Sequence, residues 1–166
     1  DLMALPLQLL VLGNGTPEIE SIFAALATRY PDRVRVVLGF DEALAHRIEA
    51  GADFFLMPSR YEPCGLNQLY SLRYGTLPIV RETGGLADTV SDLDRDPAVG
   101  RGFVFQEATP AALLAAIRRA LRLYEQPAAL LAVRRRIMGL DFSWERSAGD
   151  YLLLYAAALA ARRGEG

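Results

Sequence analysis

Hydrophobic residues occur along this chain in two alternating patterns. Short apolar runs bounded by glycine, proline or polar residues are typical of buried strands. Longer segments with apolar positions three or four residues apart follow most of these runs and indicate amphipathic helices. The predicted strands are residues 7–12, 34–38, 53–57, 77–80 and 102–105.

Helix starts are marked by capping residues. Thr16 is followed by Pro17 and Thr109 by Pro110, and a hydroxyl cap with proline at the first helical position is a common helix start. Asp41 and Ser143 are expected to cap two further helices. The predicted helices cover residues 17–30, 42–50, 66–74, 110–124, 127–138 and 143–163, with another short helix after Gly85.

Strands that alternate with helices predict a parallel sheet covered by helices on both faces. A length of 166 residues suits one domain, or one lobe of a larger protein. The chain opens almost directly on a strand, although doubly wound lobes have more strands. We therefore expect residues 1–166 to form a single partial domain. The charged segment 92–101, broken by Pro97 and Gly100, is expected to be the most mobile loop.

Composition narrows the function. The net charge of -2 gives no electrostatic reason to expect nucleic acid or an anionic membrane as a partner. Neither a signal peptide nor an apolar run of membrane-spanning length is recognisable, so a cytoplasmic protein is expected. One cysteine and one histidine argue against a disulfide and a metal site. All eighteen basic residues are arginine, which excludes a Walker A loop and a Schiff-base lysine in this chain.

The stretch from Pro58 to Asp92 carries the chemistry. It reads PSRYEPCGLNQLYSLRYGTLPIVRETGGLADTVSD and contains two strand-to-helix loops from neighbouring βα units. In an open parallel sheet, both loops would lie at the carboxyl edge of the strands, where ligands bind. Each presents backbone N–H groups at a helix start, which suits a phosphate, and the Glu62 carboxylate beside them suits sugar hydroxyls. A sugar-nucleotide site is the resulting hypothesis.

With these residues in view, the chain resembles bacterial glycogen synthases and plant starch synthases. The matching strings are HRIEAGADFFLMPSRYEPCGLNQLYSLRYGTLPIVRETGGLADTVSD, GFVF and MGLDFSW, within a resemblance that runs from Leu7 to about Ala157. It implies the C-terminal, nucleotide-sugar-binding lobe of a two-lobed GT-B-type glycosyltransferase, with a Rossmann-like sheet that lacks its first strand and helix. The missing N-terminal lobe would bind the acceptor.

The resemblance also implies a reaction. The parent protein would transfer α-glucose from ADP-glucose to the non-reducing end of an α-1,4-glucan with retention, and without a metal or redox cofactor. Glu62 would contact the donor glucose and support the charge that develops as the glycosidic bond breaks. A solvated turn residue is the alternative for Glu62.

Other site residues follow from the same resemblance. Cys64 would contact the donor sugar, or be a small packed residue, and Gly65 and Leu66 would supply N–H groups at a helix start. A side chain at position 65 would block close approach of a phosphate or sugar. The second loop would contribute Thr83, Gly84 and Gly85 to the sugar or diphosphate, unless it is a plain turn.

Two aromatic residues and two arginines complete the set of candidates. Phe40 occupies a position that lies near the adenine in the family, and core packing is an equally good explanation for it. His46 is a candidate for the donor pocket, although a lone histidine is more often structural. Arg60 and Arg81 flank the two loops and could add positive charge near the diphosphate, although solvation at the surface is the commoner role for such arginines.

The chain departs from the family pattern in two places. Tyr70 replaces a glutamate that holds the ribose in related transferases, and the arginine and lysine that clamp the diphosphate are absent. Catalysis by the 166 residues alone is therefore not expected. A second hypothesis is an inactive module that binds nucleotide with a roughly millimolar dissociation constant. A third keeps the fold and changes the nucleotide sugar.

Overall fold

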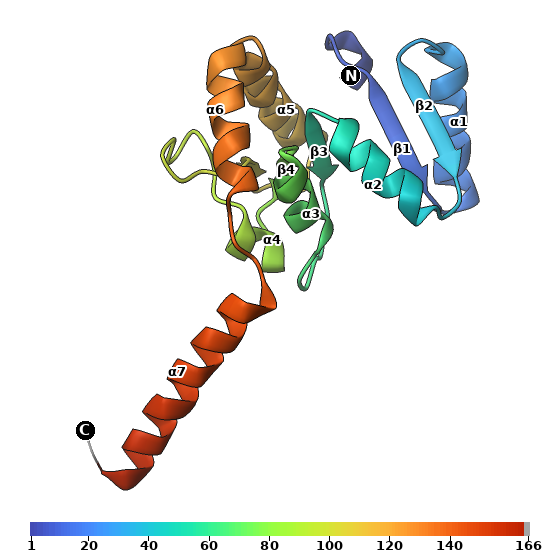
Figure 1. The fold of residues 1–166 in the computed structure, drawn as a ribbon. Coiled ribbons are helices and arrows are strands. Elements are labelled where there is room, and N and C mark those ends of the chain that lie inside the picture. The colour runs from blue at the N-terminus through green and yellow to red at the C-terminus, as the bar shows by residue number, and fades with distance from the viewer. Residues whose placement is uncertain (165–166) are drawn as a thin grey trace.

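The structure is a computed structural model that describes residues 1–164, and Figure 1 shows its α/β architecture. Two parallel sheets are flanked by helices. The strands are β1 (Leu9–Gly13), β2 (Val34–Leu38), β3 (Phe54–Met57), β4 (Leu77–Arg81) and β5 (Phe103–Phe105). The helices are η1 (Leu2–Ala4, a 3-10 turn), α1 (Pro17–Arg29), α2 (Glu42–Gly51), α3 (Asn67–Tyr74), α4 (Gly84–Thr89), α5 (Pro110–Tyr124), α6 (Pro127–Met138) and α7 (Trp144–Arg163).

Every predicted strand and helix is present, with ends within two residues of the expected ones. Asp41 caps α2 by accepting a hydrogen bond from the Leu44 N–H at 2.8 Å, and Thr109 caps α5 by accepting one from Ala112 at 3.2 Å. Thr16 lies at the cap position of α1, but its side chain makes no cap hydrogen bond.

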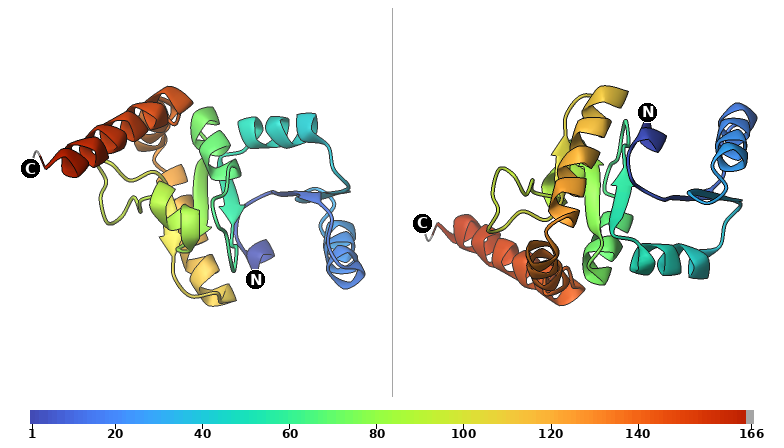
Figure 2. Two further views of the ribbon diagram at one scale, coloured as in Figure 1. Left: turned by 90° about the horizontal axis from the view of Figure 1, so that it is seen from below. Right: turned by 90° about the horizontal axis from the view of Figure 1, so that it is seen from above.

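The single continuous sheet expected from the pattern is divided in two. β1 pairs only with β2, and β3, β4 and β5 form a second sheet in that order. Figures 1 and 2 show that the β1–β2 pair and α1 stand apart from β3. α2 and the N-terminal segment lie between this pair and the three-stranded sheet. β1 and β3 thus each keep one unpaired edge. Periodicity identifies an apolar strand but does not say which strand is its neighbour, so the break was not predictable.

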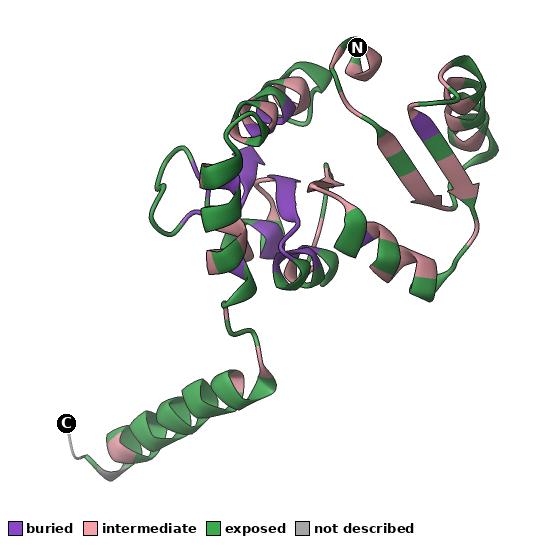
Figure 3. Ribbon diagram, turned by 45° about the horizontal axis from the view of Figure 1, so that its top comes forward, coloured by how far each residue is buried: buried purple, intermediate pink, exposed green. Residues whose placement is uncertain are grey.

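Burial follows this division, as Figure 3 shows. The side chains of β4 and β5 are almost fully buried, those of β3 are intermediate, and Leu10 on β1 and Leu38 on β2 are 54% and 52% exposed. On α1, Ile19 and Ile22 lie on the face predicted to be buried and remain 49% and 66% exposed. Apolar strands normally need cover on both faces, and here only the three-stranded sheet has it.

The core lies on both faces of that sheet. Alternate residues of β4 and β5 point to opposite sides, as the strand period requires. Leu77, Ile79, Phe103 and Phe105 join a cluster with residues of α3, α5 and α6, whereas Val80 and Val104 pack with Leu86 and Val90 at α4. This packing fixes α3 and α4 relative to the strands that precede them.

A buried ion pair ties the segment 92–101 to the core. Asp92 is 4% exposed and accepts hydrogen bonds from the Val104 N–H at 2.6 Å and from the Arg119 guanidinium at 2.9 Å. Burial disfavours the charged Asp92 carboxyl, but these hydrogen bonds outweigh it and lower its pKa. Arg119 also donates to Asp94 at 3.0 Å and to the Val104 carbonyl at 2.6 Å. The loop that the sequence marks as most mobile is therefore anchored at its start.

The last helix, α7, extends away from the rest of the molecule (Figure 1). Its large apolar residues are all more than half exposed: Trp144, Tyr151, Leu152, Leu153, Leu154, Tyr155 and Leu159. Leu152, Leu153 and Leu154 are consecutive and so point in different directions around the helix. The exposed apolar surface of this helix therefore extends around it. Among the described helices, none has the length and apolar character needed to cross a bilayer.

We expect Asp92→Asn to lower the free energy of unfolding by about 2 kcal/mol at pH 7, because it leaves the Arg119 charge half-buried without its main partner. A carboxyl whose pKa is lower in the folded state stabilises the fold above its unfolded pKa of about 3.9, and this contribution disappears as the pH falls through the folded value. Urea unfolding should therefore show a difference between wild type and variant at pH 7 that shrinks towards pH 3 (about one unit below that value).

Asp94→Asn is the matched control, since Asp94 binds the same guanidinium with a side chain that is 55% exposed. This substitution should lower the free energy of unfolding by less than about 1 kcal/mol. Equal losses for the two variants would contradict the assignment of the buried pair as the anchor.

Candidate functional site

Two strand-to-helix loops meet at the carboxyl edge of the three-stranded sheet. The first loop, residues 58–66, joins β3 to α3, and the second, residues 82–83, joins β4 to α4. β3 and β4 are parallel neighbours with Met57 opposite Val80, so both loops leave the sheet on the same side. The Gly85 N–H donates to the Glu62 carbonyl at 3.1 Å. The predicted convergence of the two loops is thereby confirmed.

The paired glycines permit this contact. A Cβ atom on Gly84 would overlap the carbonyl oxygen of Glu62, and one on Gly85 would overlap that of Cys64. Gly84 also has a φ of +45°, a conformation that side chains disfavour. The sequence pattern assigned these glycines to a ligand. The structure shows a nearer cause, which is the close approach of the first loop.

Gly65 is likewise required within the protein. Its φ is +73°, and a Cβ there would lie 2.5 Å from the side-chain oxygen of Gln68. Gly65 therefore makes room for a buried glutamine, which is a reason separate from the expected approach of a ligand. Gln68 itself was missed by the sequence reasoning. Its only signal is a polar residue on the buried side of a helix, three positions after a glycine.

Arg81 fastens the outer part of the first loop. Its guanidinium donates to the Ser59 carbonyl at 2.7 Å and also to the Arg60 carbonyl. The Arg81 guanidinium thus donates to backbone carbonyls, whereas the sequence analysis had considered it as a source of positive charge for a diphosphate. Arg60 is exposed beside it.

The functional groups at this edge are accessible. The Glu62 side chain is half-buried and makes no hydrogen bond or ion pair within the described residues. Cys64 is exposed, with its sulfur 3.6 Å from the Gly65 carbonyl. Thr83 lies at the cap position of α4 without a cap hydrogen bond from its side chain. Glu62, Cys64 and Thr83 thus offer an unpaired carboxylate, a thiol and a hydroxyl at this edge.

Backbone donors follow Glu62 along the first loop. Among the described residues, the N–H groups of Gly65 and Leu66 make no backbone hydrogen bond, since the first bonds of α3 start at Leu69 and Tyr70 and accept at Leu66. Leu66 is 54% exposed at the helix start. Free N–H groups at a helix start favour an anionic ligand.

Two predicted residues lie elsewhere. Phe40 follows β2 and is 89% exposed, so core packing does not explain it, and it belongs to the separate two-stranded sheet. His46 lies on α2, where its ring packs 5.5 Å from that of Tyr70 and its Nδ1 is 3.4 Å from the Tyr74 hydroxyl. His46 thus contacts two tyrosines of α3, the helix that follows the first loop.

A buried acid lies next to His46. Glu49 is 4% exposed, and burial raises the pKa of its carboxyl while the His46 charge opposes the shift. The Glu49 oxygen Oε2 has no hydrogen-bond partner in the described part of the chain. No group of three histidine, cysteine or acidic residues suited to a metal ion occurs in the described residues.

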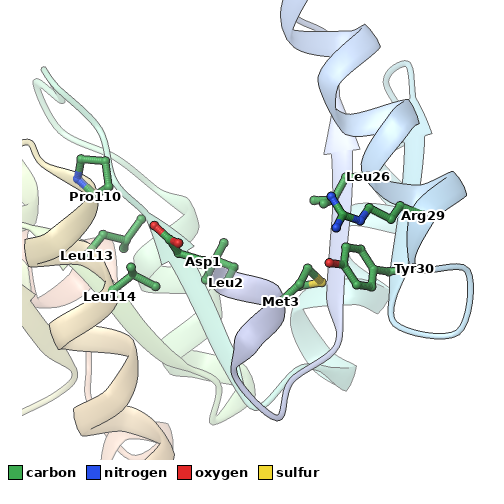
Figure 4. Close-up of a pocket in the computed structure, with 9 residues that line it drawn as sticks. All are labelled: Asp1, Leu2, Met3, Leu26, Arg29, Tyr30, Pro110, Leu113 and Leu114. Atoms are coloured by element: carbon green, nitrogen blue, oxygen red, sulfur yellow. The ribbon is translucent and has the colours of Figure 1, made fainter.

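Two clefts in the described part of the chain lie away from the two loops. One of about 380 Å³ opens between η1, α1 and the start of α5. Figure 4 shows Leu113 and Leu114 on one side of it and Tyr30 on the other. A second, of about 220 Å³, lies between α2, α3 and α6. Neither is lined by Glu62 or the glycine loop, so the candidate site is an open edge of the sheet and not one of these clefts.

A parallel α/β fold with two glycine-containing loops at its carboxyl edge belongs to the class of domains that bind ligands at this edge. The family model described as "Glycosyl transferases group 1" matches residues 2–132. The chain belongs to this family.

Its relatives are bacterial glycogen synthases. The chain is 57% identical over 163 residues to "Glycogen synthase 1" of Methylococcus capsulatus, covering 96% of the chain and 33% of the relative. It is 55% identical over 160 residues to "Glycogen synthase" of Anaeromyxobacter sp. (strain Fw109-5), covering 96% and 34%. The chain thus spans about a third of the length of the curated relatives it matches, and the resemblance seen in the sequence is confirmed.

Solved structures agree. The catalytic domain of starch synthase IV from Arabidopsis thaliana, bound to ADP and acarbose, superposes with a TM-score of 0.79 at 38% identity, covering 92% of this chain and 32% of that one. Sucrose-phosphate synthase from Thermosynechococcus elongatus gives 0.63 at 28% identity, covering 93% and 39%. The α/β fold class is confirmed.

Gly85→Ala should lower the free energy of unfolding by about 2 kcal/mol or more, because the added methyl group overlaps the Cys64 backbone and pushes the loops apart. Chemical unfolding followed by circular dichroism would measure the loss. Gly149→Ala is the control, since a Cβ there meets nothing within 4 Å, and it should be neutral or slightly stabilising. A Gly85→Ala variant as stable as the wild type would contradict the close contact.

Proposed function

We propose that these residues form the donor-binding part of a glycogen synthase, within a two-lobed glycosyltransferase. The observation that carries the proposal is the meeting of the two loops. The bond from the Gly85 N–H to the Glu62 carbonyl brings the first loop, with Glu62 and the free N–H groups of Gly65 and Leu66, against the glycine turn of α4. The relatives named glycogen synthase and the starch synthase bound to ADP support the assignment of substrate class.

The parent reaction that we propose is transfer of α-glucose from ADP-glucose to the non-reducing end of an α-1,4-glucan. Leaving-group departure puts negative charge on the diphosphate, which the N–H groups of Gly65 and Leu66 would stabilise with Gly84 and Gly85 beside them. The glucose acquires oxocarbenium character, which the Glu62 carboxylate would stabilise.

Retention is part of the proposal. The second carboxylate of the two loops, Glu82, is paired with Arg95 at 3.1 Å. With Glu62 as the free carboxylate, the acceptor would attack from the face that the diphosphate leaves. Cys64 and Thr83 would contact the sugar, with Phe40 and His46 at the edge of the donor pocket. Acceptor glucan would bind through polypeptide outside these 166 residues, and the setting would be cytoplasmic.

The first test measures radiolabel transfer from ADP-glucose to glycogen by the full-length protein that carries this chain. Glu62→Gln should lower the rate by roughly 100- to 1,000-fold, because it removes the charge that stabilises the transition state. Glu107→Gln, at an exposed glutamate beyond β5, is the matched control and should leave the rate unchanged. Unchanged labelling with Glu62→Gln would remove Glu62 from this role, and equal rates with UDP-glucose would refute the ADP preference.

A second candidate function is a nucleotide-binding module without turnover, favoured by the absence of lysine in the 166 residues. Calorimetric titration of the 166-residue chain with ADP should give a dissociation constant of about 1 mM, equivalent to about -4 kcal/mol. The full-length protein should bind at least tenfold more tightly. Micromolar binding by the 166-residue chain would contradict the need for further donor-site residues.

A further inference from the structure

A buried side-chain amide links the two loops from inside the fold. Gln68, on the first turn of α3, is fully buried. Its Nε2 donates to the carbonyls of Cys64 at 3.1 Å and Gly65 at 2.9 Å, and to the Thr89 hydroxyl at 3.2 Å. The first two acceptors belong to the first loop and the third belongs to α4. One amide group therefore contacts both halves of the candidate site.

These bonds close a ring. The Thr89 hydroxyl donates its proton to the Gly85 carbonyl at 2.5 Å, which leaves its oxygen free to accept from Gln68. The Gly85 N–H in turn donates to the Glu62 carbonyl at 3.1 Å. The ring thus runs from the first loop through Gln68 and Thr89 to the turn of α4, and back to Glu62.

The geometry of the peptide unit gives the ring a consequence for the ligand-facing side. The C=O of one residue and the N–H of the next belong to one planar trans peptide and point in opposite directions. The carbonyls of Cys64 and Gly65 point at Gln68, so the N–H groups of Gly65 and Leu66 point away from it. Neither of these two N–H groups makes a backbone hydrogen bond in the described chain.

Stability alone does not explain a glutamine here. Its Oε1 is buried without a hydrogen-bond partner among the described residues, and it lies where a Cβ on Gly65 would be 2.5 Å away. Leaving a buried acceptor unpaired costs roughly 1–3 kcal/mol. An apolar side chain of similar length would avoid that cost, whereas only the amide supplies donors for both carbonyls.

We propose that Gln68 is a positioning residue for the diphosphate of the donor. By holding the carbonyls of Cys64 and Gly65 inward, it keeps the N–H groups of Gly65 and Leu66 directed at the ligand, and through Thr89 it fixes their distance from the turn of α4. This inference rests on the proposed function and adds to it the residue that orients the backbone donors.

The test compares three variants of the full-length protein. Gln68→Glu keeps the size and removes the N–H donors, and Gln68→Met keeps the length without polarity. Thr76→Val is the control, because Thr76 is also buried and bridges two carbonyls, those of Glu49 and Ala52, away from the loops. ADP affinity by calorimetry, kcat, KM for ADP-glucose and the unfolding temperature are measured for each.

We expect both Gln68 variants to weaken ADP binding and raise KM by roughly tenfold, the effect of losing about 1.4 kcal/mol of binding energy. Thr76→Val should lower the unfolding temperature and leave ADP affinity and kcat unchanged. In Gln68→Glu, affinity relative to wild type should recover as the pH falls from about 8 to 6, since a buried carboxyl protonates in this range and its OH can then donate. Wild-type affinity in both folded Gln68 variants would overturn the proposal.

Two further measurements keep the outcome decisive. If the Gln68 variants do not fold, Thr89→Val removes the second link of the ring and should weaken ADP binding severalfold, and an unchanged affinity would overturn the proposal. Amide hydrogen exchange at Gly85 reports the ring without any ligand and should be at least tenfold faster in Gln68→Met than in Thr76→Val. If the wild-type protein binds no ADP but the exchange difference between the variants persists, the proposed function is refuted. The ring of hydrogen bonds would still be supported.

Discussion

The contact between the first loop and the turn of α4 is the constraint on which the candidate site depends. Glycine hydrogens at positions 84 and 85 let one backbone pass against another, and the Gly85 N–H then bonds the Glu62 carbonyl. Any side chain at either position would separate the loops. The position of the Glu62 backbone against the turn of α4 therefore follows from steric exclusion as much as from hydrogen bonding.

The division of the sheet gives the molecule two regions of different character. The three-stranded sheet has helices on both faces and a buried ion pair, and it carries the meeting loops. The two-stranded sheet and α7 leave many apolar side chains in contact with solvent. The chain spans about a third of the length of the curated relatives that it matches, and exposed apolar surfaces of this kind suit contacts with other protein.

For several predicted site residues, the structure gives a different explanation from the one that the sequence suggested. Gly65 makes room for Gln68, and Arg81 binds the backbone of Ser59 instead of standing free for a phosphate. Phe40 was as compatible with the core as with a ligand, and its position after β2 leaves it exposed. The bonds of Arg81 to Ser59 and of Gln68 to Thr89 join residues 22 and 21 positions apart, and no local pattern names partners at such separations.

The sequence by itself determined the strands, the helices, most of their caps and the parallel class of the fold, because these depend on apolar periodicity and on residues next to one another. It also indicated, through two glycine-containing loops after neighbouring strands, that a ligand edge exists. Only the tertiary structure decided that the sheet divides between β1 and β3, and that Gln68 and Thr89 join the loops. Strand neighbours and buried hydrogen bonds are set by the packing of distant segments, which periodicity does not encode.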